Sequence, residues 1–337
     1  MHVKRVVGRA VGAASLALAA AVTAIAGAGC GGADEGALLV GGERVDSATI
    51  DRDPLALLPS GIIMLSYLDA AMLFQSRLGP EVSQLVTGLL PLGPESNFVP
   101  SRDVTRVYGG LYAMQGADFC AVLQGTFDTD AIQRAADAKA MTTAGAPLVK
   151  SRYGDRDVFV VANVGFVVLT NRTILSGNET GIRRAIDRLR YSKLERSMAK
   201  WMTDLVSTQG AAFTVAGDFT KQPTVEAGAQ KYPFLAGLRY MRVVGNFQPP
   251  GMNFAGALTY GDPQAAATGA ANLQNLQQIA NVVTIISSWG MGPTVPPMQI
   301  AQSGNDAAFT MQMDESLVRI LLRVAADTAK RALYPVK

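Results

Sequence analysis

The sequence contains a single histidine, and it stands at position 2. Imidazole supplies the general base of Ser-His-Asp and Cys-His catalysis and is the commonest protein ligand of zinc. No imidazole follows His2 in the chain. This scarcity excludes His-dependent hydrolysis, His-ligated zinc and a histidine proton shuttle from the rest of the protein.

Cysteine is almost as scarce, since Cys30 and Cys120 are the only two in the chain. Thiolate metal cages and Cys-x-x-Cys redox motifs are thereby excluded. Cys120 stands in an apolar run with Phe119 and Val122, and no cationic neighbour in the sequence would lower its pKa. This pattern predicts a buried, unreactive thiol.

The signature motifs of nucleotide binding and nucleophilic catalysis are also missing. We find no GxGxxG after a strand, no GxxxxGKS/T and no GxSxG, so we expect no cofactor, no metal ion and no enzymatic activity. A carboxylate-dependent hydrolase stays a hypothesis, the weakest of three, because paired-carboxylate sites have no local spacing rule. The candidate pairs are Asp51 with Asp53, Asp128 with Asp130, and Asp155 with Asp157. The residues around these pairs favour plainer interpretations, which are a polar linker, a helix N-cap and a hairpin turn, respectively.

The N-terminal segment has the pattern of a signal peptide. Lys4, Arg5 and Arg9 precede an uncharged stretch of mostly Ala and Gly over residues 10–28. This is the order of a charged n-region and an apolar h-region. A membrane-spanning anchor is the alternative, since the stretch approaches the roughly 20 residues that cross a bilayer. We favour the signal peptide because no basic residues follow the stretch.

Residues 27–32, Gly-Ala-Gly-Cys-Gly-Gly, resemble a bacterial lipobox, in which small residues precede a cysteine that is diacylated and becomes the new N-terminus. The segment departs from that pattern at Gly27, where Leu is usual. The resemblance implies a lipoprotein that is held to a membrane through Cys30. Ordinary signal-peptidase cleavage after Ala26 or Ala28 is the alternative, because both positions fit the small-x-small rule.

Removal of residues 1–29 makes the protein neutral. Three of the 30 basic residues and none of the 27 acidic residues lie in this segment, so 27 of each remain. Such a balance provides no electrostatic footprint for nucleic acid. The expected partners are therefore the membrane, through the lipid anchor, and an envelope protein or a hydrophobic ligand. We expect the protein to be exported and anchored in the cell envelope.

The chain after the leader is long enough for two domains, and similar segments recur along it. We predict the α+β class with two related units, each an antiparallel sheet with helices packed on one face. The similar segments are 61–67 and 211–216, 106–109 and 242–245, 119–123 and 254–258, and 154–155 and 304–305. The expected parts are a signal peptide (1–29), a lipidated N-terminus and flexible tether (30–57), a first unit (58–205) and a second unit (206–337).

Residues 173–187, with the preceding Tyr153-Gly154 hairpin, are similar to a recurrent pattern in uncharacterised exported bacterial proteins that contain a domain of unknown function. The resemblance covers about residues 55–220 and implies no activity. Ser176 or Asn178 is expected to cap the helix that follows.

A basic segment follows, with Arg183, Arg184, Arg188 and Arg190. Beside a lipid anchor, these side chains are candidates for contact with anionic headgroups. The interpretation that we favour is a solvated helix face whose apolar residues turn inward.

Charge is nearly absent from residues 243–305, where Asp262 is the only charged residue. Amides on one side of a helix in this stretch form a candidate interaction surface. They suit a surface that is buried part of the time, because hydrogen bonds satisfy an amide whereas an unpaired buried ion costs several kcal/mol. The alternative is a helix packed internally between the two units. The candidate surface comprises Gln274, Gln277, Gln278 and Asn281.

From these observations, we predict a non-catalytic lipoprotein of the cell envelope that acts as a partner- or ligand-binding module. A carrier of a lipid or another hydrophobic ligand is the alternative, motivated by the 49% of hydrophobic residues and by the neutral second unit. A large apolar cavity would favour the carrier over a flat interaction module.

Replacement of the anchor residue tests the lipoprotein prediction. We expect Cys30→Ser to release the protein from the membrane fraction and to remove acyl mass from its N-terminus, because the acyl chains are the expected anchor. Fractionation and mass spectrometry of the intact protein measure both effects. An unmodified wild-type N-terminus at Gly27 or Gly29 would contradict the prediction.

Overall fold

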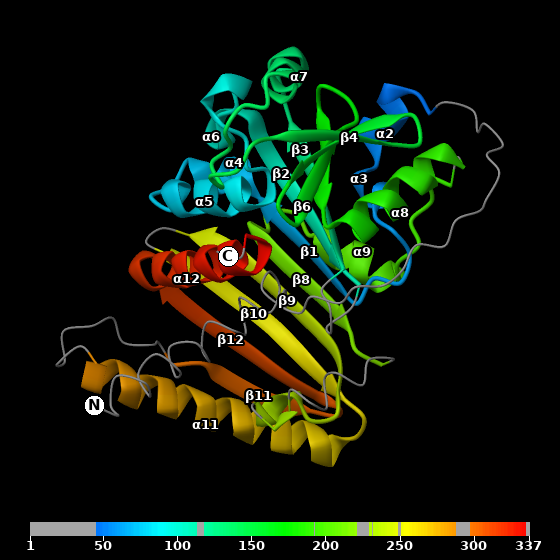
Figure 1. Ribbon diagram of the computed structural model, residues 1–337. Helices are drawn as coiled ribbons and strands as arrows, with labels where there is room; N and C mark the ends of the chain where they lie inside the picture. The colour runs from blue at the N-terminus through cyan, green and yellow to red at the C-terminus, as the bar shows by residue number, and fades with distance from the viewer. Residues whose placement is uncertain are drawn as a thin grey trace.

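The computed structural model describes residues 45–112, 118–191, 193–220, 229–230, 232–248, 251–287 and 297–334. These residues form one 12-stranded sheet in which every neighbouring pair is antiparallel (Figure 1). The strands are β1 (Met64–Asp69), β2 (Val104–Leu111), β3 (Phe119–Gly125), β4 (Val149–Tyr153), β5 (Arg156–Val161), β6 (Val164–Val168), β7 (Thr173–Gly177), β8 (Phe213–Asp218), β9 (Leu238–Gln248), β10 (Gly251–Tyr260), β11 (Gln299–Ser303) and β12 (Asp306–Asp314).

Helices occupy the connections between strands, and the local sequence explains where two of them begin. The Asp128 carboxylate accepts a hydrogen bond from the backbone N–H of Ala131 (2.9 Å), which confirms the expected N-cap. Asn178, rather than Ser176, caps the helix after β7 by accepting from the N–H of Gly181 (3.1 Å). The helices are α2 (Ser47–Arg52), α3 (Pro54–Leu57), α4 (Ala70–Phe74), α5 (Gly79–Leu89), α6 (Pro100–Asp103), α7 (Thr129–Asp137), α8 (Glu179–Arg190), α9 (Lys200–Val206), α11 (Pro263–Ser287) and α12 (Glu315–Leu333), with 3-10 helices η1 (Pro94–Ser96) and η2 (Pro233–Leu235).

The strand order repeats in the two halves of the sheet, which confirms the α+β class with two related units. The order is β11-β12-β10-β9-β8-β1-β2-β3-β7-β6-β5-β4. In each half, a three-stranded meander leads through a helix, α7 or α11, to strands that return beside the third strand of the meander. The halves meet where β1 pairs with β8, with Ser66 opposite Val215.

Three of the four expected segment pairs fall on equivalent strands, namely β1 with β8, β2 with β9 and β3 with β10. The fourth pairing is wrong. Gly154 lies between β4 and β5, whereas Gly304 lies between β11 and β12, whose counterparts by position are β6 and β7. Both glycines have positive φ (61° and 55°), so they share the chemistry of a tight hairpin without being equivalent.

The sheet runs without interruption across the boundary expected between residues 205 and 206, so the two units share one sheet. The boundary itself stays a prediction. Residues 47–57, which we expected to belong to a flexible tether, instead form α2 and α3. Asp51 holds this segment to the sheet, since its carboxylate accepts hydrogen bonds from the hydroxyls of Thr170 (2.6 Å) and Thr173 (2.7 Å). The polar-linker interpretation of Asp51 is therefore wrong.

Helices cover both faces of the first half of the sheet, which corrects the expectation of one covered face. The face that includes Met64 and Phe119, here called the α5 face, packs against α4, α5 and α7. The face that includes Leu65 and Cys120, here called the α8 face, packs against α2, α3, α8 and α9. Residues 119–123 are buried without alternation, which is the pattern of a strand covered on both faces.

The last helix breaks the symmetry of the two halves. α8 follows β7 and packs on the α8 face, whereas α12 follows β12, at the equivalent position, and packs on the α5 face through Val318 and Leu321. α12 thereby lies against α5 of the first half (Figure 1). Among the described residues, no helix equivalent to α8 covers the α8 face of the second half.

Candidate functional site

A row of small residues crosses the middle of the sheet on the α5 face. Ser66 of β1 is paired with Gly109 of β2, and Gly109 is paired with Ala121 of β3. The Ser66 hydroxyl donates to the Gly109 carbonyl oxygen (3.4 Å) and lies over the glycine, where a Cβ atom would meet it at 2.6 Å. A side chain at Gly109 would have to displace this hydroxyl, and the three small residues of the row fill little of the space above the sheet.

The rows on either side of Ser66, Gly109 and Ala121 carry large apolar side chains. Side chains of one strand face stand beside those of the neighbouring strands, so two tall rows flanking a low one form a trough. The flanking rows are Met64, Leu111 and Phe119 on one side and Leu68, Val107 and Leu123 on the other.

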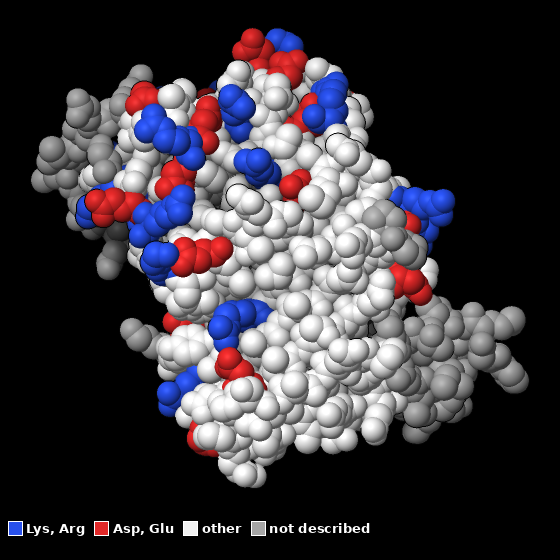
Figure 2. Space-filling model, turned by 180° about the vertical axis from the view of Figure 1, so that it is seen from behind, with Lys and Arg blue, Asp and Glu red and all other residues white. Residues whose placement is uncertain are grey.

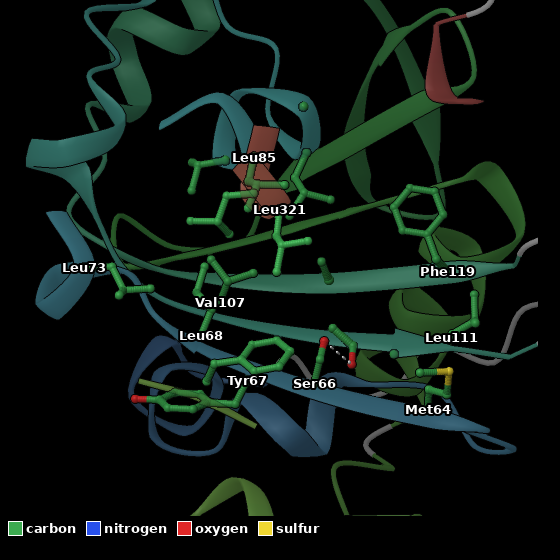
Figure 3. A pocket seen from close by; sticks show the side chains of 18 of the residues that line it. Met64, Ser66, Tyr67, Leu68, Leu73, Leu85, Val107, Leu111, Phe119 and Leu321 are labelled. Atoms are coloured by element: carbon green, nitrogen blue, oxygen red, sulfur yellow. Dashed lines mark hydrogen bonds between the residues drawn. The ribbon is translucent and has the colours of Figure 1, made fainter. Parts of the chain in front are cut away.

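Two helices, one from each half, roof this trough and leave a partly open apolar cavity of about 140 Å³. Leu85 and Leu89 of α5 and Leu321 of α12 line the roof, and Figure 3 shows Leu85 and Leu321 on the side opposite Val107 and Leu68. No charged side chain of the described residues lines the cavity. Such a space favours aliphatic or aromatic groups, because an unpaired ion placed there would lose its hydration.

Polar contacts hold α12 against α5. Glu81 of α5 is 2% exposed, and its carboxylate accepts from the Arg323 guanidinium at 2.8 and 2.9 Å. Arg319 lies 3.6 Å from the same carboxylate oxygen. Near the other end of α12, the Tyr334 hydroxyl donates to the Gly88 carbonyl oxygen (2.9 Å). The cavity roof therefore depends on contacts between the two halves of the chain.

Cys120 is buried, as predicted, on the α8 face of the sheet. Burial raises the pKa of its thiol to about 12, because the thiolate would be desolvated there. The thiol is therefore protonated at neutral pH and has the character of an inert core residue.

The four arginines expected to be candidates for membrane contact lie on α8 and contact neighbours in their own chain. Arg183 pairs with Glu179. Arg184 lies over the Tyr112 ring, with 4.9 Å from its guanidinium carbon to the ring centroid, and Arg190 lies 6.0 Å over Tyr191. Arg188 donates to two backbone carbonyls, one of them 3.1 Å away. Each of the four arginines therefore has a partner within the chain. Contact of these arginines with anionic headgroups stays a prediction.

The amide surface lies on α11, away from the apolar cavity. Gln274 and Gln278 are exposed and Gln277 is half-buried, so a helix packed internally between the units is wrong. The side chain of Asn281 and the expected anchor Cys30 lie outside the described residues. Binding at the amide surface stays a prediction.

Each of the three carboxylate pairs that suggested a hydrolase includes a side chain with a structural role. Asp128 caps α7, Asp53 pairs with Arg196 (2.8 Å), and Asp157 pairs with Lys150 (3.1 Å). In the described part of the chain, no group of three or more His, Cys, Asp or Glu side chains is placed to hold a metal ion. None of the described helices has both the length and the apolar character to span a bilayer.

Sequence reasoning missed the cavity, although a signal for its floor was present. Gly109 and Ser66 interrupt otherwise apolar strands with small residues, and a glycine inside a strand often marks a close approach. The sequence does not show that these two residues lie in one row with Ala121, because that depends on the register of three strands.

No protein-family model and no curated protein matches the sequence. Three solved structures of TP0453 are similar in fold. Crystal form I has a TM-score of 0.52 and 9% identity, and the alignment covers 81% of this chain and 97% of that one. Crystal form III has a TM-score of 0.51 and 10% identity, and the alignment covers 81% of this chain and 98% of that one. Crystal form IV has a TM-score of 0.50 and 10% identity, with 80% of this chain and 96% of that one covered. At this identity, the similarity establishes the fold alone.

Loss of the contact between α5 and α12 is expected to destabilise the protein. Arg323→Ala leaves the buried Glu81 carboxylate with Arg319 as its remaining partner, which should lower the free energy of unfolding by about 1–3 kcal/mol. Glu81→Gln in the same background should recover part of this loss, because it removes the buried charge. Urea unfolding measures both changes, with Lys200→Ala, which breaks the exposed pair of Lys200 with Asp204, as a control that costs less than about 0.5 kcal/mol. Equal stability of Arg323→Ala and wild type would contradict this account.

Proposed function

We propose that the chain is a non-catalytic binding protein of the cell envelope, anchored through Cys30, which holds a hydrophobic ligand between the sheet and the helices α5 and α12. The apolar cavity is the observation that carries this proposal. An engineered apolar cavity of about 150 Å³ binds benzene, so a space of this size can hold a small apolar group or part of one chain.

The position of the cavity also supports ligand binding rather than a packing defect. Native cores are close-packed, and a void costs roughly 24 cal/mol per Å³. Here, the space follows from three aligned small residues and from a helix that crosses to the other half. A ligand would restore the contacts that the lining side chains lack.

Filling the trough tests the proposed function. Ala121→Leu places a larger apolar side chain on the cavity floor and should weaken binding of the apolar fluorescent probe N-phenyl-1-naphthylamine at least about tenfold, since the affinity of a small ligand depends on apolar contact. The melting temperature should stay within a few degrees of wild type, because the added side chain enters empty space.

Ala267→Leu is the control, since Ala267 is exposed on α11 and does not line the cavity. It should leave probe binding unchanged. Equal binding by the wild type and Ala121→Leu, or no binding by the wild type, would overturn the ligand-binding proposal.

Binding of an envelope protein is a second candidate function, supported by the α8 face of the second half, where the described residues place no helix over β10, β12 and β11. Ala255, Thr310 and Gln299 form one row across β10, β12 and β11, and all three are exposed. Arg242 and Asp306 are charged side chains on this face, and they pair with each other at 2.9 Å. Figure 2 shows the corresponding lower part of the molecule largely free of charged side chains. Charge depletion is typical of the central part of a protein interface.

A photo-cross-linking amino acid tests this second function in intact cells. Placed at Ala255, it should yield a discrete adduct with an envelope protein, because the side chain would lie inside the contact. Placed at Lys200, an exposed position on α9, it should not. Identical adduct patterns at the two positions, or no adduct at Ala255, would contradict partner binding by this face.

A further inference from the structure

A second cavity, of about 270 Å³, shares Gly88 with the apolar one and is lined by polar and apolar residues; it is called the polar cavity here because, unlike the first, it has charged side chains in its lining. It lies between α5 and the C-terminal part of α12, whereas the apolar cavity lies under the preceding part of α12. Ser83, Gln84 and Thr87 of α5 are among its lining residues, as are Asp327 and Lys330 of α12. The same pair of helices therefore borders an apolar compartment and a polar one.

Gly88 lines both cavities, so they lie next to each other along α5. A Cβ atom at this glycine would meet no other atom within 4 Å, so open space lies beside it. Glycine inside a helix costs about 1 kcal/mol relative to alanine. At this position, the absence of a side chain keeps free the space that a ligand occupying both cavities would need.

The polar cavity presents one positive and one negative group. Asp327 and Lys330 are both exposed, and neither has an ion-pair partner among the described residues. A ligand with a single net charge would be attracted by one of these groups and repelled by the other. A headgroup with one charge of each sign complements both.

We propose that the two cavities together hold one single-chain amphiphile, with its aliphatic chain in the apolar cavity and a zwitterionic headgroup between Asp327 and Lys330. This inference rests on the proposed function and names the class of its ligand. The apolar cavity has room for part of one chain rather than for the paired chains of a diacyl lipid. The protein therefore contacts both the aliphatic chain and the headgroup of its ligand at the junction between its two halves.

Octyl amphiphiles that differ only in their headgroups test the inference with the full mature chain. Octylphosphocholine, octyl sulfate and octyltrimethylammonium compete, below their micellar concentrations, with N-phenyl-1-naphthylamine. Octylphosphocholine should bind about 3–10-fold more tightly than either singly charged compound, as expected for charge-assisted contacts at an exposed rim. Lys330→Gln and Asp327→Asn should each remove most of this preference.

Lys200→Gln, remote from both cavities, is the control for loss of one positive charge. If the probe binds but octylphosphocholine has no advantage, or if the advantage survives both Lys330→Gln and Asp327→Asn, the headgroup inference is overturned and the proposed function stands. If neither the probe nor any octyl compound binds the wild-type protein, the proposed function fails and the inference fails with it.

Discussion

The antiparallel pairing of β1 with β8 is the contact on which the remaining structure depends. It joins two similar halves into one sheet and places Ser66 and Val215 opposite each other at the centre. Without it, β1 and β8 would be edge strands with unpaired backbone groups, which are prone to pair with other chains. With it, the α5 face becomes one surface, and a helix from either half can lie across the junction.

The asymmetry of the last helix places the proposed binding site at that junction. α8 covers the half from which it arises, but α12 packs on the opposite face and lies along α5. Because both helices bridge a trough floored by small residues, their apolar sides cannot reach the sheet everywhere, and a cavity remains. The ion pairs of Glu81 add a directional contact to this otherwise apolar roof.

Local features of the fold were predictable, whereas the placement of α12 was not. Strand patterns predicted the equivalence of β1 and β8, and side-chain chemistry predicted the caps at Asp128 and Asn178, because these depend on near neighbours. α12 is apolar over much of its circumference, so its sequence does not indicate which sheet face it covers. The candidate site could not be predicted from the sequence either, because the register of the strands alone brings Ser66 and Ala121 into one row.

A crystal structure of the mature protein with bromooctyl phosphocholine, brominated at the end of its chain, tests the central claim most directly. The account predicts an anomalous bromine peak over the row formed by Ser66, Gly109 and Ala121, beneath Leu321. It also predicts headgroup density beside Lys330. A structure in which α5 and α12 close onto the sheet, with Leu85 and Leu321 filling the trough and no bromine peak there, would contradict it.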